Sequence, residues 1–395
     1  MILNKKKIIR FIFFSILVFS YLNAVLRVSP ESKFTLFRIL IPLIFIYTLF
    51  DSFYQFRKFY IILLALLIYG FINSVFISKW HSFNFAYFLH YATLLLLFFL
   101  VKVYSNKFGF DVFYKHLKQF YIFMVFMGFI QILTKIPWPN VELRDSPNIF
   151  FSVENDYAAA LGVFIPFLII DKTGNKYINW LIAFAGFYLI IIAEARIAMI
   201  SIIFFLFLIL WDRFKIIGSM IFILFLNIGY NVLNEINLGG NNFFELFIDP
   251  FNHIVNLEPY NIGGSIYDRT DALINGIIAY KETFGFGIGP GNTSANLFKD
   301  PEYHLATAES MHNFFAQVIV EYGWLMIVGF FFIFFYIKKI RSNAILENNN
   351  AFKYYIFSVI LTSLSQSEGL FSNYFFFVTV YFSIYYFNIK YTEFK

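Results

Sequence analysis

The chain contains no cysteine and few charged residues. Without thiols it can form neither disulfide bonds nor thiolate-metal sites. Only 14% of its 395 residues are charged, whereas 60% are hydrophobic and 23% are aromatic. A soluble domain of this length could not hide so much apolar surface, because about half of its residues must face water. The composition therefore predicts an integral membrane protein.

The chain also lacks a concentrated basic patch. Its net charge is +6, but the lysines and arginines are scattered near the ends of apolar runs. We therefore expect no nucleic-acid partner. The N-terminal stretch "MILNKKKIIR" precedes an apolar segment, and no small-residue cleavage site follows it. This segment is accordingly predicted to be an uncleaved first helix.

Long apolar runs make up most of the sequence. Each is close to the ~20 residues that cross a bilayer as a helix. The sequence thus predicts an all-α polytopic membrane protein, a single domain over residues 1–395. We expect about twelve transmembrane helices, at roughly 8–27, 34–50, 59–78, 84–101, 117–134, 157–171, 177–194, 197–211, 214–232, 311–337, 352–366 and 369–388.

The distribution of basic residues supports this number of spans. With the N-terminus placed inside, the cytoplasmic segments hold 20 lysines and arginines and the outer segments hold nine. Cytoplasmic loops of membrane proteins carry such an excess, and a wrong number of spans would scramble it. We therefore expect both termini to be cytoplasmic.

One connection is much longer than the others. Residues 233–309 are predicted to form a large outer loop with ten acidic and three basic residues. Within it, "DRTDALINGIIAYKETFGFGIGPGN" predicts a short helix followed by a glycine-rich turn. Asp268 is a plausible N-cap, and Leu273, Ile277 and Tyr280 can share one face of the helix. The segment could lie on the membrane surface or fold back over the helices.

Several polar groups are predicted near the outer face. Charges at membrane depth are costly, so each is a functional candidate. Glu194 and Arg196 lie in a hairpin almost too short to leave the bilayer, although an arginine there could simply reach the headgroups. Glu154, Asn155 and Asp156 stand at the entrance of a span, where helix capping is the alternative interpretation.

The outer loop has its own candidates. Arg269 is the only arginine in it, and it either pairs with Asp268 or Asp271 or is held ready for an anionic ligand. Gly287 and Gly289 belong to a glycine run that could let backbone amides approach a phosphate or sugar closely. A plain flexible turn fits the run equally well, and no strand-turn-helix pattern surrounds it as a dinucleotide site would require.

The segment "ESMHNFFAQVIVEYGW" places Glu309, His312 and Asn313 directly against an apolar run. A histidine at this position is an anchor, a packing residue or part of a reaction centre. The predicted topology puts it on the same face as Arg196 and Arg269. No His/Glu spacing indicates zinc, and the scattered carboxylates make a weak case for a divalent ion. We expect neither metal nor cofactor.

The order of these motifs resembles a known family. "SVENDYAAAL", "EARIAM", "DRTDAL", "GFGIGPGN" and "MHNFFAQVIVEYGW" follow one another as in the O-antigen ligase and Wzy-type polysaccharide polymerase superfamily. The resemblance covers roughly residues 148–337. It implies a multi-helix, GT-C-like glycosyltransferase fold. It also implies that glycan is taken from an undecaprenyl-diphosphate carrier on the outer side of the bacterial inner membrane.

The resemblance assigns roles to individual residues. Arg196 matches the family arginine after the short outer hairpin, Arg269 matches the outer-loop arginine, and His312 with Asn313 matches the "HN" pair. The chain also departs from the family pattern. Ala195 replaces a frequent Ser, Leu273 a frequent Trp, and Thr283 with Phe284 stands where Pro often precedes the glycines.

The chemistry is consistent with these assignments. Outside the cytoplasm a glycosidic bond must be made from a pre-activated donor, such as a lipid-linked diphosphate. Arg196 and Arg269 would stabilise the leaving diphosphate by charge-assisted hydrogen bonds without a metal. His312 would accept the proton of the acceptor hydroxyl. The expected substrate-binding residues are Asn155, Gly287, Gly289, Asn313 and Glu309.

The sequence thus favours a surface-polysaccharide polymerase that uses an undecaprenyl-diphosphate-linked oligosaccharide and an acceptor glycan. An O-antigen ligase, which differs in the acceptor, is the alternative. A polysaccharide flippase or transporter is the rival from another class, although no two-half repeat is evident. A non-catalytic assembly scaffold is a third alternative, and it would tolerate loss of His312, Arg196 and Arg269. Besides the lipid bilayer, the expected partners include a flippase and a chain-length regulator.

Overall fold

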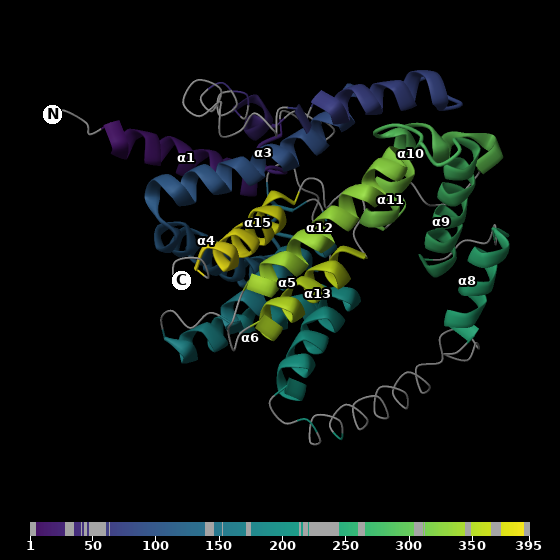
Figure 1. Cartoon of the computed structure of the whole chain (residues 1–395). Coiled ribbons are helices and arrows are strands. Elements are labelled where there is room, and N and C mark those ends of the chain that lie inside the picture. The colour runs from purple at the N-terminus through teal and green to yellow at the C-terminus, as the bar shows by residue number, and fades with distance from the viewer. Residues whose placement is uncertain are drawn as a thin grey trace. The chain divides into compact units, whose positions relative to one another are not determined.

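In the computed structural model (Figure 1), helices are the main regular element of the described residues, joined by turns and irregular segments. Those residues contain no β-strand, only an isolated antiparallel bridge between Arg27 and Thr35. The described residues are 5–27, 35–40, 64–138, 146–151, 153–170, 175–212, 245–259, 265–303, 311, 313–343, 349–364 and 373–390, with the single positions 42, 46, 61, 62, 215 and 220.

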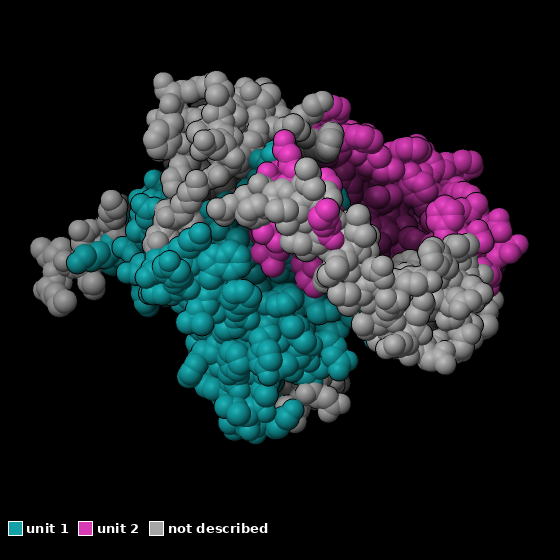
Figure 2. All heavy atoms as spheres, turned by 90° about the horizontal axis from the view of Figure 1, so that it is seen from below, with its two compact units in different colours: residues 1–68, 85–202, 338–395 teal, residues 69–84, 203–337 magenta. Residues whose placement is uncertain are grey.

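The chain divides into two units (Figure 2). Unit 1 comprises residues 1–68, 85–202 and 338–395, and unit 2 comprises residues 69–84 and 203–337. Both units therefore combine segments that lie far apart in the sequence.

Unit 1 is organised around a buried helix. Its helices are α1 (Lys5–Tyr21), α3 (Phe85–Phe108), α4 (Phe110–Thr134), α5 (Glu154–Ile170), α6 (Lys176–Ile192), α13 (Asn349–Leu364) and α15 (Tyr374–Lys390). Helix α5 packs against α4, α6, α13 and α15. Every residue of α5 from 156 to 168 is buried, and a helix that is apolar on all sides needs this central position.

Helix α6 carries an apolar stripe on its outer side. Asn175 begins the helix as an N-cap and accepts hydrogen bonds from the amides of Tyr177 and Ile178. Tyr177, Leu181, Phe184, Tyr188 and Ile191 follow at helical spacing, and all five are exposed. A continuous exposed apolar stripe of this kind is typical of contact with lipid.

Unit 2 contains the predicted outer loop, residues 233–309. After the π-helical segment η1 (Asn73–Ile77) it comprises α8 (Glu245–Asn256), α9 (Ser265–Glu282), α10 (Asn292–Ala295), the 3₁₀ turns η2 (Leu297–Lys299) and η3 (Pro301–Tyr303), α11 (Phe314–Tyr322) and most of α12 (Trp324–Asn343). A small core joins these elements, consisting of Ala272, Ala279, Ile288, Leu297, Phe298, Tyr303, Met311 and Val320.

Two predictions about helix boundaries are wrong. The predicted single span 311–337 is two helices, α11 and α12, because Gly323 between them has a φ of 58° that a continuing α-helix cannot contain. Asp268 is not the N-cap of its helix, since α9 begins at Ser265 and Asp268 lies inside the first turn.

The number of spans stays a prediction. Among the described residues, two helices are long and apolar enough to cross a membrane, Tyr87–Phe108 and Phe110–Thr134, and three shorter apolar helices accompany them. The predicted spans 34–50 and 214–232 lie mostly outside the described residues.

Candidate functional site

The glycine-rich turn closes unit 2 by pairing with the end of α11. The amide of Ile288 donates to the carbonyl of Val320 at 3.0 Å, and the amide of Gly289 donates to that of Glu321 at 2.9 Å. The amide of Trp324 donates to the carbonyl of Gly285 at 2.9 Å. Helix α9 runs into this turn and α11 ends beside it, so the C-terminal ends of the two helices are adjacent.

The same packing brings the other ends of α9 and α11 to one side. The two helices contact each other. Gly276 leaves room for Met311 and Val320, since a Cβ built on it would meet Met311 Cε at 2.5 Å. Arg269 precedes Gly276 by seven residues, which is two turns on the same face of α9, about 10 Å along the axis. Arg269 and Asn313 therefore lie on the same side of unit 2.

Asn313 begins α11. Its side-chain oxygen accepts a hydrogen bond from the amide of Ala316 at 3.0 Å, which is N-cap geometry. Asn313 thus has a structural role besides its predicted role in binding substrate. The cap uses the side-chain oxygen and not the two N–H groups of the amide.

Arg196 lies in unit 1, at the hairpin after α6. The amide of Arg196 donates to the carbonyl of Glu194 at 2.9 Å, and a helix runs from residue 196 to 212. Glu194 has a φ of 52°, a left-handed conformation that is costly for a residue other than glycine. The side chain of Arg196 is exposed. A cation at the first residue of a helix opposes the helix dipole, so helix stability does not explain this arginine.

The remaining predicted site residues are partly buried, buried in the glycine turn, or outside the described residues. Asn155 lies in the first turn of α5 in unit 1, partly buried. Gly287 and Gly289 are buried in the glycine turn, and their amides already donate within the protein, to Thr283 Oγ1 and the Glu321 carbonyl. Their binding of substrate stays a prediction. Glu309 and His312 lie outside the described residues, although their neighbour Met311 is buried against α9.

Comparison with known proteins bears on this arrangement. Residues 181–333 match the family model described as O-antigen ligase. This part of the chain is similar to O-antigen ligases. The match covers the short hairpin, the outer loop and α11, and it confirms the resemblance predicted from the motifs. No curated protein and no solved structure gives a match to the chain.

The similarity to O-antigen ligases supports a coarse assignment. Members of this family are membrane enzymes of the glycosyltransferase type, and the apolar helices of both units are compatible with a membrane. Arg196, Arg269 and Asn313 all fall within the matched residues. In the described part of the chain, no group of three His, Asp or Glu side chains is placed to hold a metal ion.

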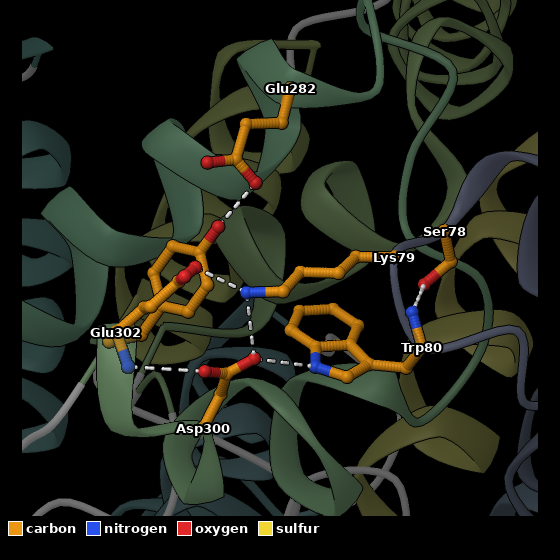
Figure 3. Close-up of polar contacts among 7 residues, drawn as sticks. Ser78, Lys79, Trp80, Glu282, Asp300 and Glu302 are labelled. Carbon is orange, nitrogen blue, oxygen red and sulfur yellow. Dashed lines mark hydrogen bonds and ion pairs between the residues drawn. The ribbon is translucent and has the colours of Figure 1, made fainter.

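A polar cluster in unit 2 is absent from the sequence-based predictions (Figure 3). Trp80 Nε1 donates to Asp300 Oδ2 at 2.9 Å, and Lys79 Nζ pairs with Asp300 at 3.1 Å and with Glu302. The hydroxyl of Tyr303 donates to Glu282, and its ring faces Trp80 edge-on and Lys79 at 5.3 Å. We call these six residues the Lys79 cluster. It joins α9, the segment before α3 and the turn η3.

Hydrogen bonds shift the titration of this cluster. The Glu302 amide, the Trp80 indole and Lys79 all favour the ionised carboxylate, so the pKa of Asp300 lies below its usual value. Bonds to Glu302 and Asp300 raise the pKa of Lys79. The sequence shows these residues only as isolated charges some 220 positions apart, which is why composition and spacing did not reveal the cluster.

Proposed function

We propose that the protein is a membrane glycosyltransferase that forms glycosidic bonds in a surface polysaccharide. It takes glycan from an undecaprenyl-diphosphate donor on the outer face of the membrane and transfers it to an acceptor sugar hydroxyl. The favoured reaction is polymerisation of repeat units. Ligation to a lipid-core acceptor is the second candidate, because the matched family is described as O-antigen ligase.

One observation carries the proposal. Within the matched segment, the packing of α9 on α11 puts Arg269 on the same side as Met311 and Asn313, the residues on either side of His312. Arg269 and His312 would supply the two groups that a displacement at the anomeric carbon needs. The guanidinium stabilises the departing diphosphate oxygen, and the imidazole accepts the proton of the attacking hydroxyl.

Atoms and charge balance in this reaction. The acceptor oxygen bonds to the anomeric carbon as the bond from that carbon to the diphosphate oxygen breaks. The acceptor proton passes to His312, and the lipid diphosphate leaves with the bonding electrons. The second arginine, Arg196, adds a positive group for the diphosphate, since two guanidinium forks can contact more of its oxygens than one. Asn155 and Glu309 would hold sugar hydroxyls.

Substitution of the arginines tests the phosphate role. Arg196→Lys and Arg269→Lys keep the charge but lose the planar fork, so each should lower turnover at least about tenfold with a purified lipid-diphosphate donor. Lys281→Ala serves as the control, because this exposed cation on α9 lies outside the proposed site. Parental turnover in both lysine variants would remove the arginines from the mechanism.

Substitution of the histidine tests the base. His312→Ala should lower product formation by about 10²–10⁴-fold while thermal stability stays near that of the parent. Loss of stability in step with activity would instead identify a packing histidine.

Offering a lipid-linked repeat unit and a lipid-core acceptor in parallel separates polymerase from ligase. Transport of labelled lipid-linked glycan in liposomes without new glycosidic bonds would support the flippase.

A further inference from the structure

Unit 1 contains a cavity that the proposed reaction does not use. It lies between α1 and α4 and has a volume of about 180 Å³. From α1 it is lined by Phe14, Leu17, Val18 and Tyr21, and α4 supplies chiefly aromatic side chains such as Phe120. A dry cavity of about 150 Å³ can hold a benzene ring. The cavity between α1 and α4 therefore has room for a segment of a hydrocarbon chain.

Ring contacts show that α1 and α4 run in the same general direction along the cavity. The ring centroids of Phe14 and His116 are 4.7 Å apart, and those of Tyr21 and Phe120 are 4.4 Å apart. The step from Phe14 to Tyr21 advances α1 by about two turns, and the step from His116 to Phe120 advances α4 by about one. The N-terminal ends of both helices therefore lie at the same end of the cavity.

Basic side chains stand at this end. Lys7 and Arg10 precede Phe14 by two turns and by about one turn, which puts them on the face of α1 that lines the cavity. Lys115 is related to Gln119, another lining residue, in the same way on α4. All three basic side chains are exposed, and none forms an ion pair with a carboxylate of the described residues.

Little negative charge opposes these cations. Asp111 is the only acidic residue in the first two turns of α1 and α4. The predicted topology puts this end of both helices at the cytoplasmic face. Clusters of lysine and arginine at the cytoplasmic ends of membrane helices attract anionic lipid headgroups. The cavity thus combines apolar walls with a basic end.

We propose that the cavity between α1 and α4 binds an acyl chain of an anionic phospholipid from the leaflet predicted to be cytoplasmic. The phosphate of this lipid lies against Lys7, Arg10 and Lys115, where charge-assisted hydrogen bonds hold it. The apolar walls accommodate hydrocarbon, and the cations select the headgroup. Both helices lie outside the residues matched to the O-antigen ligase model, so this binding does not depend on the proposed transferase activity.

Lipid retention by the full-length protein tests the site. The protein is purified in detergent and titrated with phosphatidylglycerol or phosphatidylcholine of identical acyl chains, and bound lipid is counted by native mass spectrometry. Phosphatidylglycerol should bind more tightly, and Arg10→Gln and Lys115→Gln should each weaken its binding about fivefold. Lys176→Gln is the matched control, because Lys176 is an exposed cation at the start of α6 on the same predicted face. This variant should bind as the parent does.

Filling the cavity tests its part in binding without a change of charge. Val18→Trp should weaken phosphatidylglycerol binding and reduce the rise in thermal midpoint that the bound lipid gives the parent. If Val18→Trp does not fold, Gln119→Trp narrows the cavity from an exposed position on α4. Equal affinity for the two lipids, or parental binding in the folded cavity-filling variant, would overturn the proposal. So would a loss in Lys176→Gln as large as that in Arg10→Gln, because the attraction would then be unspecific.

Discussion

Two buried glutamines show how differently one residue type can be used in this protein. Gln131 in α4 is nearly buried, its Oε1 accepts from the amides of Asn148 and Ile149, and its Nε2 donates to Asn148 Oδ1 at 3.0 Å. Gln317 in α11 is fully buried, and neither polar atom of its side chain has a partner in the described part of the chain. The first glutamine joins two segments, whereas the second carries a desolvation cost.

Replacing each glutamine by methionine should therefore have opposite effects. Gln317→Met keeps the side-chain length and removes an unsatisfied amide, so it should stabilise the protein by about 1–3 kcal/mol. Gln131→Met leaves two backbone amides without an acceptor and should destabilise it by a similar amount. Thermal unfolding in detergent measures both. A Gln317→Met protein less stable than the parent would show that the amide has a partner, such as a bound water.

The glycine turn packs the C-terminal end of α9 against the C-terminal end of α11. Gly287 has a φ of 92°, and a Cβ added to it would lie 2.6 Å from the amide nitrogen of Gly323 and 2.7 Å from the carbonyl oxygen of Glu321. Both obstacles are backbone atoms, which cannot rotate away. The sequence predicted close approach of backbone at these glycines, and in the structure the approaching group is the protein's own chain.

Gly287→Ala should consequently destabilise unit 2. The left-handed backbone alone costs about 1–2 kcal/mol for a residue with a Cβ, and the clash adds to this. Gly109→Ala is the matched control, because its φ is 93° but a Cβ there would meet nothing within 4 Å. The thermal midpoint should fall further for Gly287→Ala than for Gly109→Ala. Equal losses in the thermal midpoint would show that the glycine turn and the end of α11 can move apart at no cost in stability.

The Lys79 cluster should make unit 2 sensitive to acid. The pKa of Asp300 is lower in the folded protein than its usual 3.8, so its stabilising contribution is present above that value and is lost as the pH falls through the folded pKa. Asp300→Asn should abolish this part of the acid response. Thermal unfolding between pH 3 and pH 6 measures it, with the exposed Asp212→Asn as control. An unchanged acid profile in Asp300→Asn would contradict the role of the cluster.

The elements differ in how well the sequence predicts them. Helices α5 and α6 begin and end within three residues of their predicted spans, because continuous apolar runs determine them. The division at Gly323 was missed, since one glycine in an apolar run is compatible with a helix. The sequence also could not reveal the pairing of Lys79 with Asp300 or of Arg38 with His90, because both depend on tertiary contacts.

The apolar surface of the described helices indicates a membrane, and the distribution of basic residues predicts the orientation in it. The exposed stripes of α6 and α12 are large and apolar, as expected for helices that face lipid. The excess of lysine and arginine in alternate connections predicts that α9 and the glycine turn lie outside the cytoplasm. This placement matters for the chemistry, because a lipid-linked diphosphate is an activated glycan donor that does not require cytoplasmic nucleotide sugars.

Accessibility to a membrane-impermeant reagent tests this orientation on a chain that has no cysteine of its own. Glu245→Cys lies at the start of α8 in the predicted outer loop, and Asn350→Cys lies near the start of α13 in the predicted cytoplasmic segment 338–351. An impermeant maleimide added to intact cells should label Glu245→Cys alone, and both variants should react after permeabilisation. The parent provides the background. Labelling of Asn350→Cys but not Glu245→Cys in intact cells would reverse the topology. It would also move Arg269 away from the face on which the proposed donor is presented.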